Sequence, residues 1–224
     1  MKTSNIIILS VIALFFISTI GTNLALRKEF KKIDKADPSY GYSKEVLKPF
    51  KYVRLHGSGF GLTQIQQGVE PQIRMITKKE YLDWKISNDT LVLTYKADWN
   101  KANEFGDLSG KPSIYITAPQ LSAISSDNIR YRVVKFKFKE LSLDQKGLET
   151  LFSQTSAEKL NVTVTSGGNL RFDEKNQFGN ASIDISDKSS LEIDKNIFAS
   201  LQTRIDSSSK VRVPGSLINV LNNK

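Results

Sequence analysis

The 224-residue chain contains no cysteine and only one histidine, His56. The missing thiols exclude a disulfide framework, a thiolate zinc site, a cysteine nucleophile and the lipid-bearing cysteine of a bacterial lipoprotein. A Ser-His-Asp triad would depend on His56 alone, which lies beside Gly57 in an alternating segment where a structural role is far commoner. The glycine-rich stretch 57–61 lacks the following helix that a phosphate-binding loop needs. We therefore expect no catalytic residue, no metal site and no cofactor.

A single long uncharged stretch lies near the N-terminus, Ile6–Leu26, which is 21 residues. About 20 apolar residues are enough for a helix to cross a bilayer core of ~30 Å. A signal peptide is the alternative, with Lys2 before an apolar region at 6–17 and a poor cleavage site at 19–21. Residues 1–26 are therefore predicted to be a membrane anchor or signal peptide, with a retained anchor favoured.

Basic residues follow this stretch, namely Arg27, Lys28, Lys31, Lys32 and Lys35. By charge alone they place the C-terminal side in the cytoplasm, yet a long following domain translocates largely regardless of such charges. The orientation therefore stays open. Residues 27–48 are predicted to form a polar, basic stalk. The formal net charge of +9 favours the membrane surface, not nucleic acid, as the anionic neighbour of a tethered chain.

From residue 49 to residue 224 the pattern alternates with a period of two, which predicts an all-β head domain. Five related segments start 20, 19, 21 and 20 residues apart, at Leu121, Leu141, Leu160, Ala181 and Leu201. In the last three segments the third, fifth, eleventh and thirteenth places are apolar, except for Thr203, and a polar turn lies between them.

This spacing predicts a single-stranded β-solenoid, similar to a parallel β-helix, with turns of ~20 residues. One such turn cannot bury its apolar face alone, whereas stacked turns make a continuous core. An antiparallel sandwich is the alternative, since its strands also recur at short intervals. The predicted fold is thus all-β, a solenoid preceded by one N-terminal transmembrane or signal helix.

The segment RYRVVKFKFK at 130–139 is the strongest candidate for binding. In an extended strand Arg130 and Arg132 share a face, and the lysines share a face after a change of parity at 133–134. The candidate ligand-binding residues are Arg130, Arg132, Lys135, Lys137 and Lys139, with Val134, Phe136 and Phe138 towards the core. Such a cationic stripe suits an anionic glycan or a lipid headgroup. The alternative is a solvated edge, because lysines discourage edge pairing.

Two further features are weaker candidates. Residues 96–112 break the alternation, and Trp99 within them is a candidate to stack on a sugar, or else packs the loop down onto the head. The acidic residues Asp184, Asp187, Glu192 and Asp194 are candidates for calcium binding or for cleaving carbohydrate. The ordinary interpretation of their positions is an outward, solvated face.

Several segments together resemble one known family. Phe50, Val53, Leu55, Gly57 and Leu62 match its opening pattern, and NDTLVLTY at 88–95 and IYITAPQLSAISSD at 114–127 continue the match. The turn Ser166-Gly167-Gly168 is similar to its repeated turns. The chain resembles, over Phe50 to Val213, the auto-transporter adhesin head family, or head GIN domain, of Bacteroidetes envelope proteins. This resemblance implies a β-solenoid head outside the inner membrane and supplies no catalytic residues.

We therefore predict a non-enzymatic binding, adhesion or scaffolding module anchored in the cell envelope. Its partner would be an envelope glycan, a lipid headgroup or a protein, with the membrane bound through residues 6–26. The predicted location is the inner membrane, single-pass, with the head outside the cytoplasm, or secreted if the signal is cleaved. Two alternatives remain: a carbohydrate-active β-helix enzyme using the region of Asp184, and a membrane-bound regulatory partner in envelope-stress signalling.

Overall fold

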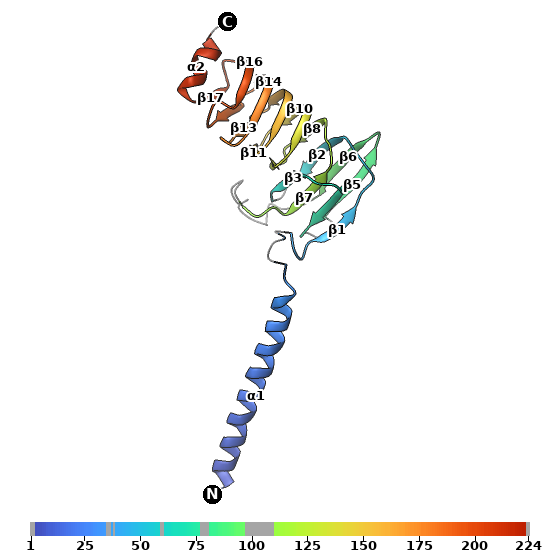
Figure 1. Ribbon diagram of the computed structural model, residues 1–224, viewed down its shortest axis with the longest axis vertical. Coiled ribbons are helices and arrows are strands. Elements are labelled where there is room, and N and C mark those ends of the chain that lie inside the picture. The colour runs from blue at the N-terminus through green and yellow to red at the C-terminus, as the bar shows by residue number, and fades with distance from the viewer. Residues whose placement is uncertain are drawn as a thin grey trace. The chain divides into compact units, whose positions relative to one another are not determined.

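The computed structural model describes residues 3–34, 37, 39–58, 61–76, 81–96 and 110–222. The chain divides into two compact units, Met1–Gly41 and Tyr42–Lys224. The first unit contains helix α1 (Thr3–Lys31) and the second contains two β-sheets and a short C-terminal helix (Figure 1).

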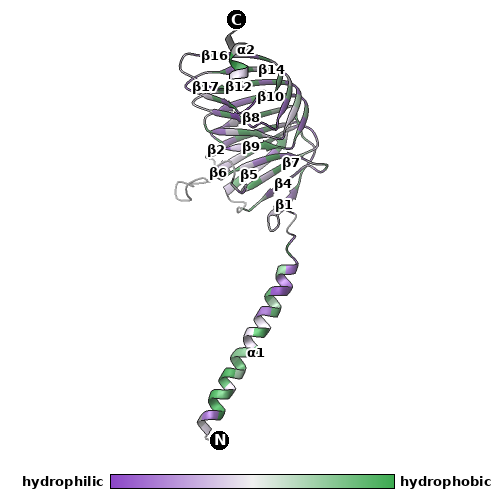
Figure 2. Cartoon of the chain, turned by 60° about the vertical axis from the view of Figure 1, so that its left-hand side comes forward, coloured by the Kyte–Doolittle hydropathy of each residue, from purple (hydrophilic) through white to green (hydrophobic). Residues whose placement is uncertain are grey.

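Helix α1 is 29 residues long, which corresponds to about 43 Å, and its apolar side chains are exposed along most of its length. Its N-terminal half is mainly hydrophobic and its C-terminal end is polar (Figure 2). Residues Asn5–Lys31 are long and apolar enough to cross a membrane, a test that a signal sequence also passes. The helix continues beyond the uncharged stretch to include Arg27, Lys28 and Lys31.

The second unit is built from a nine-stranded and an eight-stranded sheet. In spatial order the nine-stranded sheet consists of β1 (Ser43–Val46), β4 (Gln72–Met75), β7 (Ile114–Ala118), β3 (Thr63–Gln67), β9 (Tyr131–Val134), β11 (Glu149–Ser153), β13 (Asn169–Phe172), β15 (Ser190–Ile193) and β17 (Lys210–Arg212). The eight-stranded sheet consists of β16 (Phe198–Ile205), β14 (Gln177–Ile185), β12 (Ser156–Thr165), β10 (Lys137–Lys146), β8 (Ala123–Asp127), β2 (Tyr52–Ser58), β6 (Thr90–Lys96) and β5 (Leu82–Ser87). Helix α2 (Gly215–Asn222) follows, with Leu217 buried in the same core.

The predicted single-stranded β-solenoid is wrong, because the strands form two mixed sheets. Strand β3 lies between β7 and β9, and β2 lies between β6 and β8, so the first strands of the head are inserted out of chain order. Strands β1, β4 and β5 pair antiparallel with their neighbours. A chain that wound in one direction would give only sequential, parallel neighbours. The regular spacing in the C-terminal half therefore marks parallel pairing within each sheet, and not a closed coil.

Alternating side chains explain why these segments form strands and where the core lies. In β12 the apolar residues Leu160, Val162 and Val164 are buried while Thr163 is exposed. Parallel pairing sets Leu141 beside Leu160 and Leu160 beside Ala181, so apolar side chains line up across neighbouring strands of the sheet. Figure 2 shows the resulting alternation of polar and apolar residues along the strands. Burying the apolar set between the two sheets is the main source of stability.

Aromatic side chains form a column in the C-terminal half of the core. The ring of Phe172 lies 5.3 Å from the rings of Phe152 and Phe178 and 5.7 Å from that of Phe198, measured between centroids. Edge-to-face and tilted pairs of this kind add to the stability gained from burial alone. The column thus ties residues of both sheets together.

Two strands of the eight-stranded sheet interrupt their alternation of buried and outward residues with two consecutive residues that are not buried. In β14 these are Gly179 and Asn180, and in β10 they are Lys139 and Glu140. A Cβ atom on Gly179 would lie only 2.3 Å from the carbonyl oxygen of Glu158 on β12. Position 179 in β14 therefore requires glycine, because the neighbouring backbone leaves no space for a side chain.

Buried polar side chains satisfy the backbone at the corners between the sheets. Asn176 is buried; its Oδ1 accepts a hydrogen bond from the Thr155 amide at 2.9 Å and its Nδ2 donates to the Phe152 carbonyl at 2.8 Å. Gln145 is fully buried and its Nε2 donates to the carbonyl oxygens of Gly147 and Leu148, which both have positive φ. These amides replace the strand partners that the turning backbone loses.

Candidate anion-binding groove

A step in the eight-stranded sheet creates a groove. The N-terminal half of β10, Lys137–Leu141, pairs with β12 on one side, but β8 begins only opposite Ser142. The segment 119–122, which connects β7 to β8, lines the other side of the groove. The groove has a volume of about 580 Å³ and is lined by Lys51, Gln67, Pro119, Gln120, Leu121, Ser122, Lys137, Phe138, Lys139 and Glu140.

The side-chain amide of Gln67 links the two walls of this groove. Its Oε1 accepts a hydrogen bond from the backbone amide of Lys137 at 3.3 Å, and its Nε2 donates to the carbonyl of Pro119 at 3.0 Å. Gln67 is the last residue of β3, in the other sheet. One end of the groove is therefore fixed by a contact between the two sheets.

The charge of the groove is positive. Lys51, Lys137 and Lys139 are exposed and form no ion pair within the described part of the chain. The carboxylate of Glu140 lies 2.9 Å from Lys159 Nζ, so its charge is already compensated. Lys51 is held in place by its carbonyl, which accepts a hydrogen bond from the Ser122 amide at 2.8 Å. Three lysines around one hollow, with the only carboxylate neutralised, suit an anionic group.

The sequence candidates are divided between two sheets. Arg130 and Arg132 lie at the nine-stranded sheet, where Arg130 Nε is 3.8 Å from Glu149 Oε2 and Arg132 Nε donates to Gln64 Oε1 at 2.7 Å. Burial lowers the pKa of Arg132. Lys135 lies at the corner between the sheets, where its φ is +53°. Only Lys137 and Lys139 reach the groove, and Trp99 lies outside the described residues.

The corner at Lys135 also changes which side chains of residues 130–139 face the core. Val133 is fully buried and Val134 is only half-buried, whereas Phe136 and Phe138 are buried as expected. The positive φ of Lys135 turns the chain from one sheet into the other, so the alternation of a single extended strand does not hold across it. For this reason the two arginines and the groove lysines do not form one stripe.

Lys51 and Gln67 were not among the candidates from the sequence. Each lies in a separate segment far from residues 137–139, and no local motif marks either one. They reach the groove because β2 pairs with β8, β8 pairs with β10, and β3 ends at the step. Only the pairing of distant strands reveals this site.

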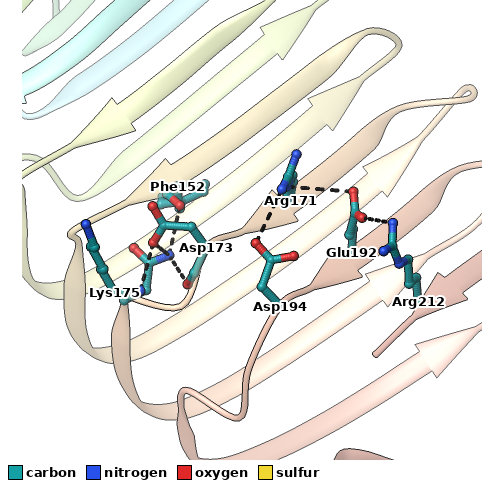
Figure 3. A network of polar contacts seen from close by, with 8 residues as sticks. Phe152, Arg171, Asp173, Lys175, Glu192, Asp194 and Arg212 are labelled. Atoms are coloured by element: carbon teal, nitrogen blue, oxygen red, sulfur yellow. Dashed lines mark hydrogen bonds and ion pairs between the residues drawn. The ribbon is translucent and has the colours of Figure 1, made fainter. Parts of the chain in front are cut away.

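Three of the four acidic candidates, Asp184, Glu192 and Asp194, are held in ion pairs. Asp184 on β14 lies 3.0 Å from Arg204 Nη2, whereas Glu192 on β15, in the other sheet, lies 2.6 Å from Arg212 Nη1. Figure 3 shows Arg171 between Glu192 and Asp194, at 3.8 and 3.4 Å. Burial opposes the charge of Arg171, but the nearby carboxylates raise its pKa.

These contacts give the acidic residues a structural role. Within the described ranges, no group of three His, Cys, Asp or Glu side chains is placed to hold a metal ion. The hydrolase alternative considered Asp184 with Asp187 and Glu192 with Asp194. Asp184 faces Arg204, and both members of the second pair face Arg171. The geometry therefore offers no support for that alternative.

The chain is similar to several solved structures of bacterial proteins, including the following three. A structure of a putative adhesin from Bacteroides fragilis has a TM-score of 0.48 and 14% identity and is matched over 76% of this chain and 95% of that chain. A putative adhesin from Parabacteroides merdae (TM-score 0.30, 12% identity) is matched over 78% and 96%. A putative lipid binding protein from Parabacteroides distasonis (TM-score 0.27, 11% identity) is matched over 78% and 98%.

No curated protein matches the chain. The model of the family described as "Putative auto-transporter adhesin, head GIN domain" matches residues 50–216, which include nearly all strands of the two sheets. This match covers most of the chain and includes the segments that line the groove. The chain therefore belongs to the head GIN domain family of putative auto-transporter adhesins.

Proposed function

We propose that the protein is a membrane-tethered, non-enzymatic binding head that works outside the inner membrane and holds an anionic ligand in the groove. The observation that carries this proposal is the set of three lysines around one hollow without a carboxylate partner in the described residues. Membership of an adhesin-type family supports a binding role. Helix α1 supports the tether, since it is long and apolar enough to span a bilayer.

The groove lysines favour shallow, cumulative recognition. A single exposed ion pair contributes only about 0–1 kcal/mol, so a useful affinity requires that Lys51, Lys137 and Lys139 act together. Such contacts are screened by salt, with a Debye length of about 8 Å at physiological ionic strength. A ligand with several negative charges therefore fits the groove better than a ligand with one.

Charge reversal in the groove is expected to remove this binding. The full chain in detergent micelles is tested against immobilised dextran sulfate, a sulfated polysaccharide, near physiological salt. The variant K51E/K137E/K139E should bind at least about tenfold more weakly than the wild type, which corresponds to about 1.4 kcal/mol. The matched control K85E/K146E/K210E reverses three exposed lysines elsewhere on the head.

The control variant distinguishes an effect of the groove lysines from an effect of the net charge of the head. Both variants reverse three lysines, at two charges each, and so lower the formal net charge from +9 to +3. The affinity of the control variant should stay within about threefold of the wild type. A threefold change corresponds to less than half the binding free energy of a tenfold change. Equal weakening of both variants, with circular dichroism showing that both are folded, would mean that net charge alone binds the polymer and would contradict the proposal.

A further inference from the structure

The open edge of β10 offers unused backbone groups to the groove. Residues Phe138–Leu141 pair with β12, yet among the described residues no backbone hydrogen bond joins them to segment 119–121. The first such bond appears where the groove closes, from the Ser142 amide to the Ser122 carbonyl at 2.9 Å. An open edge of this kind accepts an additional strand, because its N–H and C=O groups need partners.

The amide of Gln67 shows what kind of group fits between the walls. It accepts a hydrogen bond from β10 through Oε1 and donates one to segment 119–122 through Nε2. Like a backbone peptide group, this side-chain amide presents a carbonyl acceptor, and the carbonyls of a strand added to β10 accept from its N–H groups in the same way. At this end of the groove the walls are therefore spaced for one extended chain.

The side chains beside the open edge of β10 indicate which residues an added peptide strand would carry. Lys51, Lys137 and Lys139 are exposed and favour carboxylates, whereas Leu121 and Phe138 line the same groove but are almost fully buried. An extended peptide presents successive side chains to opposite sides. Acidic residues that alternate with apolar ones match both features.

We propose that the groove captures an extended acidic segment of a partner protein, which adds as a short strand to the open half of β10. This inference rests on the proposed function, since it names the partner of the same groove. It adds that backbone hydrogen bonds contribute to binding, a feature that an anionic glycan or a lipid headgroup would not reproduce.

The test uses fluorescein-labelled hexapeptides and the full chain in detergent micelles, with binding followed by fluorescence anisotropy. The parent peptide alternates glutamate and valine. One derivative carries N-methyl groups on the three glutamates and the other carries them on the three valines. Both keep the charge and the side chains of the parent. In an added strand, only every second N–H points to the receptor strand, so only one of the two derivatives loses its hydrogen bonds.

Strand addition therefore predicts an asymmetric result. One derivative should bind at least about tenfold more weakly than the parent, and the other should stay within about threefold. K51E/K137E/K139E should lose binding of the parent, whereas K85E/K146E/K210E should keep it. Absence of binding by the parent, or equal affinities of the two derivatives, would overturn the inference. The dextran sulfate experiment judges the proposed function independently, because that polymer has no peptide groups.

Discussion

Replacing Phe172 with alanine is expected to lower the free energy of unfolding of the head by about 4 kcal/mol. Phe172 is fully buried and its ring lies within 5.7 Å of the rings of Phe152, Phe178 and Phe198. The substitution removes the buried area, leaves a cavity and breaks three aromatic contacts at once. Denaturant unfolding of the full chain in detergent, followed by near-ultraviolet circular dichroism, measures the loss.

An exposed aromatic residue provides the control for this prediction. Tyr52 lies on β2 with 41% of its surface exposed, so Tyr52→Ala should change the free energy of unfolding by only about 0.5 kcal/mol. Similar losses for the two variants would contradict the aromatic column as a main source of stability. A loss confined to Phe172→Ala supports it.

Replacing Asn176 with aspartate is expected to destabilise the head by about 3 kcal/mol, although the two side chains have nearly the same shape. The Nδ2 of Asn176 donates to the carbonyls of Phe152 and Asp173, at 2.8 and 2.9 Å. A carboxylate has no donor, so its oxygen would face both carbonyl oxygens from a buried position, close to the carboxylate of Asp173. A buried charge without a partner is costly.

Asn196 allows a matched control for this substitution. It is exposed, and only its Oδ1 makes a described contact, accepting a hydrogen bond from the Phe198 amide at 3.2 Å. Aspartate keeps this acceptor, so Asn196→Asp should remain within about 0.5 kcal/mol of the wild type. The same denaturant experiment compares the two variants. If Asn176→Asp were as stable as Asn196→Asp, the donor role of Asn176 at the corner would be wrong.

The alternation in the sequence predicted the β class of the head but not its sheet order. Residues such as Val162 and Val164 are buried because a period of two places them on one face of a strand. The regular spacing indicated the parallel neighbours in the C-terminal half, where the segment starts at Leu141, Leu160, Ala181 and Leu201 pair with one another. No such spacing marks the earlier strands. The insertion of β2 and β3 between later strands, and the antiparallel β1, β4 and β5, depend on contacts between segments far apart in the chain.

The site was predictable only in part for the same reason. Lys137 and Lys139 stand in a visibly basic segment, whereas Lys51 and Gln67 join them only through strand pairing and the step at β10. Asn176 gave no signal, since one asparagine in a polar turn is common and its role depends on the backbone of the neighbouring strand. The groove and the corner depend on contacts between segments that no sequence repeat relates, so the pattern of the sequence did not show them.

The central claim is that the head works outside the inner membrane, and cysteine labelling tests it directly. The chain has no cysteine, and Ser182 on β14 is exposed and makes no described side-chain contact. Ser182→Cys therefore introduces one thiol on a folded head. A membrane-impermeant maleimide is added to spheroplasts, which lack an outer barrier, and to lysed cells. We expect full labelling in spheroplasts before lysis and recovery of the labelled chain in the membrane fraction. Labelling only after lysis would place the head in the cytoplasm and contradict the account.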